Sequence, residues 1–237
     1  AGAMPDVPTI NASPFRRCDW YSNGVSHIEI SFGVTSIGMN AFEGCRGLQT
    51  IAIPDSVTSI GNAAFRSSSL TSVTLPSSLT SLGSSTFSGC DYLTEIHVAP
   101  GSQSYASDGG VVFTKDMKTL VVCPEGKAGA YVIPGSVTGI GEYAFNYCEK
   151  LTGVTIPNGV TGIGRGAFAN CWRLSGVTIP DSVTSIGDYA FSSCAELTSV
   201  TIPGSVTDIG AAAFYNCSFL TEIQVDSGNP AYTSEGG

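Results

Sequence analysis

The chain has 237 residues, a formal net charge of −9 and a charged fraction of only 12%, against about 25% in ordinary globular domains. Ten lysines and arginines spread along such a chain do not form the basic surface that phosphate backbones require, so the sequence excludes nucleic acid as a partner. No apolar run approaches the ~18 residues of a membrane span, and we expect no membrane insertion.

A repeat of 23 residues organises most of the chain. The unit that begins at Leu174, LSGVTIPDSVTSIGDYAFSSCA, recurs almost unchanged from Leu197. Its first segment alternates large apolar with small polar residues, which is typical of a strand with one buried face. Pro203 ends that strand because it lacks an N–H, and Gly210 permits a sharp turn. We expect one helical or 3-10 turn to carry Phe214 into the core.

The repeat can be followed through single positions. The leading residues are Val25, Leu48, Leu70, Leu93, Leu151, Leu174, Leu197 and Leu220. The core phenylalanines are Phe42, Phe65, Phe87, Phe145, Phe168, Phe191 and Phe214. One unit is a residue short, because four residues separate Phe65 from Leu70 where five separate Phe42 from Leu48. A unit this small cannot bury its own apolar side, whereas stacked copies bury a continuous core.

The pattern C-x-x-L-T-x-V-x-I-P-x-S-V-T-x-I-G-x-x-A-F resembles the BspA-like class of leucine-rich repeats, from about Val25 to Val225 apart from one insert. The resemblance implies a repeat solenoid, a curved right-handed coil that is mostly β with short helical or 3-10 turns. It also implies a cell-surface or secreted protein, since such repeats occur in surface proteins of bacteria and protozoan parasites. Several of those are adhesins for host matrix or plasma proteins.

One departure from leucine-rich repeats in general is the lack of an asparagine column after the strand. Serines stand in that region instead, at Ser56, Ser78, Ser136, Ser182 and Ser205. We therefore expect hydroxyl groups to satisfy the backbone in these turns.

The chain divides by pattern into five parts. Residues 1–24 do not repeat, and we interpret them as an expression remnant followed by an N-terminal cap or a degenerate first repeat. Repeats occupy residues 25–98 and 131–225. Between them, residues 99–130 form an insert in which Val111–Phe113 and Leu120–Val122 predict a β-hairpin, either as a protruding binding loop or packed on the array edge. Residues 226–237 begin a truncated copy of the insert, because Val225–Gly237 matches Val98–Gly110 at six of thirteen positions.

That truncation predicts an unprotected last turn, which would favour end-to-end self-association.

Six of the eight cysteines share one repeat position, namely Cys45, Cys90, Cys148, Cys171, Cys194 and Cys217. An even count in a surface protein suggests disulfides, but identical positions in successive coils stack as a column, and buried free cysteine behaves as a small hydrophobe. We therefore favour a column of reduced thiols. Zinc is not expected, since no C-x-x-C spacing occurs and His27 and His97 are the only histidines.

No catalytic constellation is evident, and the sequence predicts a protein that is not an enzyme. Glu95 and His97 lie two residues apart on one strand and are the nearest approach to a catalytic pair. His27 and Glu29 occupy the equivalent places in another coil. The pairing of glutamate with histidine therefore reflects their place in the repeat and not a catalytic function. The glycines fall one per turn and form no phosphate-binding loop, so no cofactor is expected.

Candidate partner-binding residues lie where the repeat loses its uniformity, between the cysteine and the leading leucine. Aromatic residues and arginine dominate interface hot spots. Our candidates there are Arg46, Tyr92, Lys150, Trp172, Arg173 and Phe219. Glu95 and His97 are added as strongly polar residues at outward positions of a strand. The alternative is a solvated loop whose rings lie on the array.

Three functions remain open at this point. The first is a protein-binding module, with adhesion to host or extracellular-matrix proteins as the role that the resemblance implies. The second is a structural spacer that presents another domain. The third, ice or crystal-surface binding through Thr155, Thr178 and Thr201, is disfavoured because Gly153, Gly176 and Ser199 interrupt the second column it would need.

Overall fold

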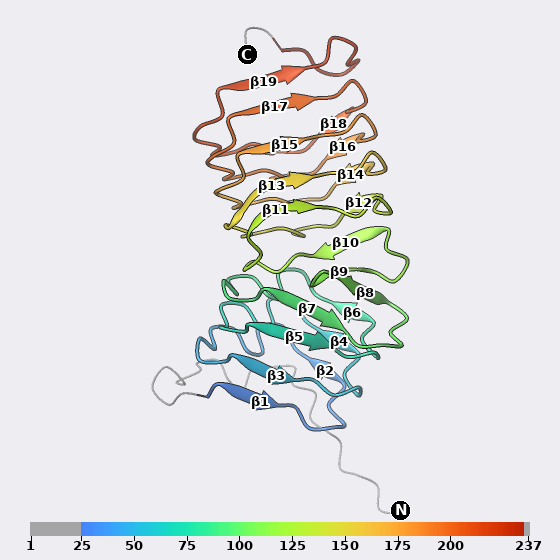
Figure 1. The fold of residues 1–237 in the computed structure, drawn as a ribbon, viewed down its shortest axis with the longest axis vertical. Helices are drawn as coiled ribbons and strands as arrows, with labels where there is room; N and C mark the ends of the chain where they lie inside the picture. Colours follow the sequence, from blue (N-terminus) through green and yellow to red (C-terminus); the bar gives the residue numbers. More distant parts are fainter. Residues whose placement is uncertain (1–24, 235–237) are drawn as a thin grey trace, which may run out of the picture. The chain divides into compact units, whose positions relative to one another are not determined.

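The computed structural model describes residues 25–234, and the chain divides into two compact units, residues 1–115 and 116–237. Each unit is a stack of coils in which a longer strand and a two-residue strand recur (Figure 1). We call the sheets of longer strands the front sheets and the sheets of short strands the back sheets. The predicted N-terminal cap, residues 1–24, lies outside the described residues.

The front strands of the first unit are β1 (His27–Glu29), β3 (Thr50–Ala52), β5 (Ser72–Leu75) and β7 (Glu95–Val98). Its back strands are β2 (Ser36–Ile37), β4 (Ser59–Ile60) and β6 (Ser81–Leu82), followed by β8 (Tyr105–Asp108) and β9 (Val111–Thr114). β1 pairs with β3, β5 with β7, and β2, β4 and β6 form one sheet, all in parallel.

The front strands of the second unit are β11 (Gly129–Val132), β13 (Leu151–Thr155), β15 (Gly176–Thr178), β17 (Ser199–Ile202) and β19 (Glu222–Val225). Its back strands are β10 (Thr119–Val122), β12 (Gly139–Ile140), β14 (Gly162–Ile163), β16 (Ser185–Ile186) and β18 (Asp208–Ile209). Within this unit all the described pairs are parallel.

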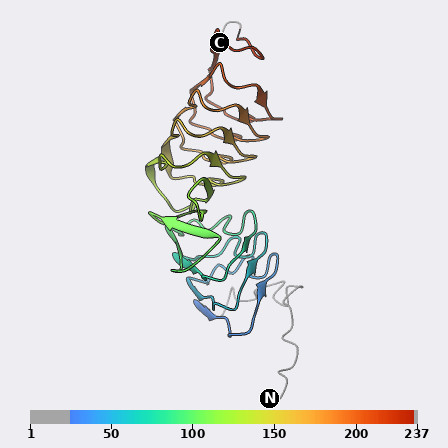
Figure 2. The ribbon, with the colours of Figure 1, turned by 90° about the vertical axis from the view of Figure 1, so that its right-hand side faces the viewer.

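The strand register confirms the repeat. Val154 pairs with Val177 and Val200 with Ile223, each 23 residues further along the chain, whereas Ile60 pairs with Leu82 across the shortened unit. Within each unit, strands of successive coils lie one above another (Figure 2). The solenoid predicted from sequence is therefore the fold.

The core of each unit is a column of stacked phenylalanine rings. Phe145, Phe168 and Phe191 are fully buried, and the centroids of neighbouring rings are 4.9 and 5.1 Å apart with nearly parallel planes. Phe42 and Phe65 stack in the same way in the first unit, at 5.4 Å. Each ring thus packs against the coils on both sides, which explains why a single repeat has no stable core of its own.

The segment that carries each phenylalanine is not the helical turn that we predicted. The described residues contain no helix, and this segment is a run of turns in every coil. Tyr143 and Tyr147 both have positive φ, 57° and 59°, which an α-helix does not accommodate. The Phe145 N–H donates to the Ala167 carbonyl of the next coil at 2.7 Å. Hydrogen bonds between coils therefore replace those of a helix.

The glycine that precedes this segment is required by the close approach of neighbouring coils. A Cβ on Gly187 would lie 2.6 Å from the Arg165 backbone nitrogen. No real Cβ makes so short a contact, so the Ile-Gly pair in each repeat marks the place where two backbones touch.

The prediction that hydroxyls satisfy the turns is confirmed. Ser78, Ser182 and Ser205 each donate a hydrogen bond of 2.6–2.7 Å to a valine carbonyl of the preceding coil. In the last described coil Asn229 replaces the serine in this role, because its Nδ2 donates hydrogen bonds to the carbonyls of Pro203 and Val206.

The insert contains an antiparallel hairpin of β8 and β9, which runs through Gly109–Gly110. The sequence predicted strands at Val111–Phe113 and Leu120–Val122, which are present as β9 and β10, but it missed β8. The Tyr105 hydroxyl accepts the Leu82 N–H at 3.1 Å, and the Ser107 hydroxyl accepts the Val98 N–H at 2.9 Å. β8 thus occupies the place of a further coil on the back of the first unit.

The C-terminal copy of this segment makes the same contacts in the second unit. The Tyr232 hydroxyl accepts the Ile209 N–H at 3.1 Å, and the Ser234 hydroxyl accepts the Val225 N–H at 3.2 Å. The back strand β18 therefore has a capping partner at Ile209, so this end of the ladder is not as unprotected as we expected. Self-association stays a prediction.

The cysteine column is only partly the one predicted. Cys90, Cys148, Cys171, Cys194 and Cys217 are free, as is Cys123, but Cys45 is disulfide-bonded, so the prediction of reduced thiols is wrong at that position. The free thiols are held by the core: Cys171 donates to the Phe145 carbonyl at 3.0 Å and Cys194 to that of Phe168 at 3.2 Å. These two thiols thus each link two coils.

Candidate functional site: the rim between cysteine and leucine

The rim is the turn between the cysteine position and the leading leucine of each coil. The Leu93 N–H donates to the Cys90 carbonyl at 2.9 Å, and the Leu174 N–H to that of Cys171 at 3.0 Å. This i to i+3 bond defines a β-turn, whose two central residues have no place in the core. The rim residues are Arg46, Gly47, Ser69, Asp91, Tyr92, Glu149, Lys150, Trp172, Arg173, Ala195, Glu196, Ser218 and Phe219.

Three aromatic side chains on the rim are exposed to solvent. Tyr92 and Phe219 are each 63% exposed and Trp172 is 47% exposed. The expected alternative, rings that lie flat on the array, would bury them further. Large exposed rings on a turn that the backbone fixes are typical of a contact surface.

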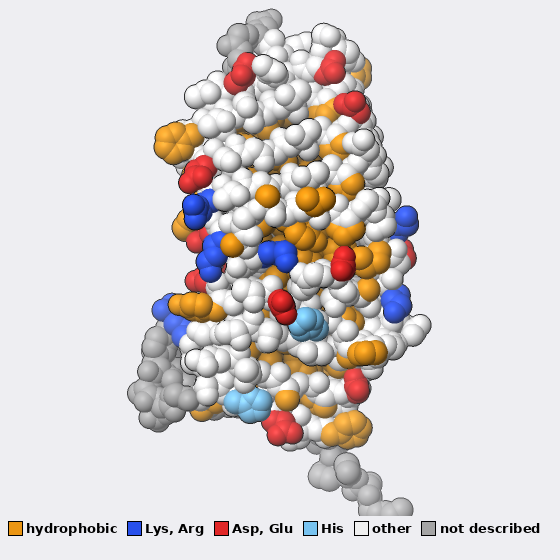
Figure 3. All heavy atoms as spheres, in the orientation of Figure 1, with side chains coloured by type: hydrophobic (Ala, Val, Ile, Leu, Met, Phe, Trp, Pro, Cys, Tyr) orange, Lys and Arg blue, Asp and Glu red, His pale blue; other side chains and the backbone are white. Residues whose placement is uncertain are grey.

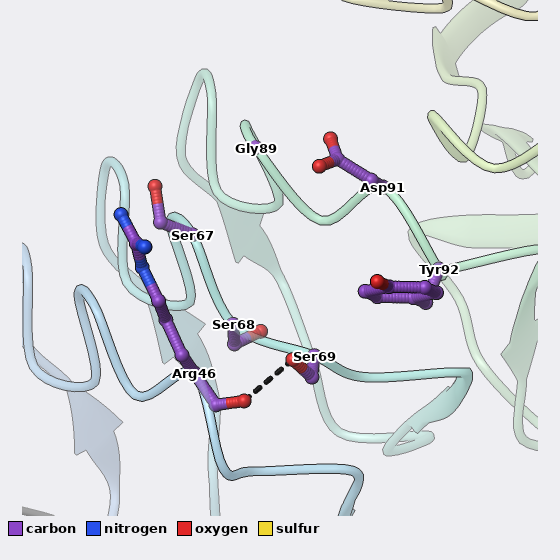
Figure 4. Close-up of a pocket in the computed structure, with 7 residues that line it drawn as sticks. All are labelled: Arg46, Ser67, Ser68, Ser69, Gly89, Asp91 and Tyr92. Atoms are coloured by element: carbon purple, nitrogen blue, oxygen red, sulfur yellow. Dashed lines mark hydrogen bonds between the residues drawn. The ribbon is translucent and has the colours of Figure 1, made fainter. Parts of the chain in front are cut away.

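In the first unit two of the predicted residues line one cavity. It has a volume of about 410 Å³ and is open to solvent. Arg46 and Tyr92 lie on opposite sides of it, Asp91 lies on the side of Tyr92, and Ser68 and Ser69 lie between them (Figure 4). The full lining is Arg46, Ser67, Ser68, Ser69, Gly89, Asp91 and Tyr92.

Sequence reasoning found the walls of this cavity but not its floor. The signal for the floor was the residue missing between Phe65 and Leu70, which the sequence analysis did not connect with a cavity. The three serines of the shortened turn are small, and Ser69 is held down by a hydrogen bond from its hydroxyl to the Arg46 carbonyl at 2.5 Å.

Glu95 and His97 lie on β7 of the front sheet, away from the rim. Glu95 Oε2 is 3.0 Å from His97 Nε2, and both side chains are more than half exposed. Within the described residues, no hydroxyl or thiol hydrogen-bonds to either side chain. The Nδ1 of His27 is 2.7 Å from the Thr50 hydroxyl instead.

In the second unit the predicted residues Lys150, Trp172, Arg173 and Phe219 share the rim. Lys150, Arg173 and Phe219 occupy the second position of their turns and Trp172 the first. Successive rims are tied together, since the Glu196 N–H donates to the Trp172 carbonyl at 3.0 Å and the Phe219 N–H to that of Ala195 at 3.2 Å. These bonds give the rim a fixed backbone.

A second cavity, of about 460 Å³, lies on the front sheet of the second unit, and its signal was not recognised in the sequence. Thr178, Ser199 and Thr201 line this cavity. Asp181 and Asp226, which come from coils two repeats apart, line it as well. Most of the face shown in Figure 3 is likewise uncharged, with acidic and basic side chains scattered over it.

The described residues contain no cluster of three or more histidine, cysteine or acidic side chains placed to hold a metal ion. Between residues 25 and 234 the structure also has no helix of the length and hydropathy needed to cross a membrane.

Stacked parallel strands with a 23-residue register and a leucine-led rim define a leucine-rich-repeat solenoid. The family model for the BspA type leucine rich repeat region matches residues 8–120 and 127–233 in six copies. The chain belongs to this family.

Solved structures agree with that assignment. The pneumococcal vaccine antigen PcpA is 28% identical, with a TM-score of 0.80 over 86% of this chain and 51% of that chain. A leucine rich cell surface protein from Faecalibacterium prausnitzii is 30% identical, with a TM-score of 0.69 over 90% of this chain and 63% of that one. The chain thus spans only half to two thirds of these structures. A comparison with curated proteins found no match.

Proposed function

We propose that this chain is a non-enzymatic protein-binding module of a cell-surface or secreted protein, and that it adheres to host or extracellular-matrix proteins through its rim. The observation that carries the proposal is the exposure of Tyr92, Trp172 and Phe219 on one turn of the repeat. On the front strands β5, β15 and β17, by contrast, the exposed positions carry only serine, threonine and glycine. Variation concentrated on a rigid, repeated turn is how a repeat array would encode partner specificity.

Two further points support the proposal. The proteins similar in structure include a vaccine antigen and a cell surface protein, which favours the same location for this chain. The low charge of the array would also permit close contact with a partner, because few hydrated charges need to be stripped of water.

The test is binding of the purified chain to immobilised fibronectin, fibrinogen and a panel of matrix proteins at physiological salt. The double variant Tyr92→Ala/Trp172→Ala should lose saturable binding while its melting temperature stays unchanged, because both side chains are exposed. The matched control is Tyr215→Ala, which removes a ring that is 66% exposed but lies outside the rim.

Binding that survives the double variant would refute the rim as the site. Absence of binding to every protein tested would instead favour the spacer function, for which the uniform front sheet is suited.

A further inference from the structure

The cavity of the first unit exists because one rim turn is a residue short. Rims before and after it place two residues between the cysteine position and the leading leucine, Arg46–Gly47 and Asp91–Tyr92. The intervening coil has Ser68 at the cysteine position and only Ser69 before Leu70. The stack keeps its register, with Ser59 pairing with Ser81 on the back sheet, so the deletion is expressed at the surface as a notch.

The notch has a fixed floor. Ser68 Oγ lies 3.3 Å from Cys90 Sγ, and Ser69 Oγ donates to the Arg46 carbonyl. A Cβ on Gly89 would lie 2.8 Å from Ser67 Oγ, so that position has no room for a side chain beside Ser67. Ser68 is buried, whereas Ser69 is partly exposed and its hydroxyl keeps acceptor lone pairs that this contact does not use.

The walls of the notch carry groups of opposite chemistry. The Arg46 guanidinium supplies only donors and the Asp91 carboxylate only acceptors. A ligand with a net charge would be attracted by one of these groups and repelled by the other. The Tyr92 ring adds an exposed apolar surface. Among the described residues no aliphatic side chain lines the cavity, so a hydrophobic group of a partner would gain little there.

We propose that this notch binds a sugar residue of a neutral glycan. A sugar is a neutral ligand whose hydroxyls both donate and accept hydrogen bonds, which matches Arg46, Asp91 and the serines together. Its C–H face can pack on the Tyr92 ring. The cavity volume of about 410 Å³ falls within the range of small-ligand sites. This site shares Tyr92 with the proposed protein contact, but it takes a different class of ligand and does not depend on that contact.

The test uses the whole chain and a panel of neutral trisaccharides, namely maltotriose, cellotriose, mannotriose and chitotriose, titrated by calorimetry and by amide chemical shifts. At least one should bind with a dissociation constant of about 1 mM, since an open cavity covers only part of its ligand. Shifts should centre on Ser68, Ser69 and Tyr92.

Two kinds of variant separate the notch from the rest of the rim. Inserting one alanine between Ser68 and Ser69 restores the spacing of the other rims, fills the notch and should abolish sugar binding. Tyr92→Ala and Asp91→Asn leave the backbone unchanged, and each should weaken binding about tenfold. Tyr215→Ala, outside the rim, should have no effect on sugar binding.

Failure of all four sugars to bind, or binding that the insertion and Tyr92→Ala both leave intact, would overturn the proposal. Neither result would affect the matrix-protein test, where Trp172 and Tyr92 act as exposed rings. Should the insertion unfold the chain, Tyr92→Ala and Asp91→Asn still decide the question.

Discussion

Phe168 shows how much of the fold rests on one side chain per coil. Its ring is fully buried between those of Phe145 and Phe191, with centroids at 4.9 and 5.1 Å. Truncation would leave a cavity that two stiff coils cannot close. Phe168→Ala should therefore lower the free energy of unfolding by about 3–5 kcal/mol, measured by urea denaturation.

The same substitution at Phe219 is the control, because that side chain is 63% exposed on the rim. Its effect should stay within about 0.5 kcal/mol. Equal losses at the two positions would contradict the assignment of Phe168 to the core column.

Which of these residues could be recognised in the sequence depends on whether the signal is periodic. Phe168 and Ser182 recur at a fixed spacing, so the column and the hydroxyl contacts were predictable. The positive φ of Tyr143 was not, because tyrosine gives no local sign of a left-handed backbone and only the next coil imposes it. The disulfide at Cys45 was missed because its position looks identical to that of the free thiols.

At the scale of the strand and turn, the two copies of the insert sequence act as caps of their arrays. Tyr105 and Tyr232 each accept the N–H of a back-strand residue 23 positions earlier. The aligned sequences showed that these segments match, but β8 escaped prediction because Tyr105–Asp108 has little of the alternation typical of a strand. A capping role needs the hydroxyl position, which the sequence does not supply.

Tyr232→Phe tests this role. It removes the acceptor for the Ile209 N–H and should cost about 0.5–1.5 kcal/mol of unfolding free energy, with the same result for Tyr105→Phe in the first unit. Tyr215→Phe, which alters an exposed ring outside the caps, should be neutral in the same urea titration. A neutral Tyr232→Phe would mean that the cap does not depend on the hydroxyl.

Over a whole unit, the column of thiols couples the stability of the array to pH. Burial raises the pKa of Cys148, Cys171 and Cys194 well above the ordinary value of 9.0. Below pH 9 these thiols are protonated in the folded and the unfolded chain alike, so their full contribution to the free energy of unfolding is present. Above pH 9 the unfolded chain releases protons that the folded chain retains, and the free energy of unfolding falls.

At pH 10 each of these thiols should have lowered the free energy of unfolding by about 1.4 kcal/mol, and the three together by about 4 kcal/mol. Urea unfolding between pH 8 and 10, in oxygen-free buffer that keeps the thiols free without reducing the disulfide of Cys45, measures this loss. Cys171→Ala should reduce the loss by about a third, because alanine has no proton to release. A free energy of unfolding that stays constant to pH 10 would show that the thiols ionise in the folded coils, and the column would then not be the sealed interior that the structure describes.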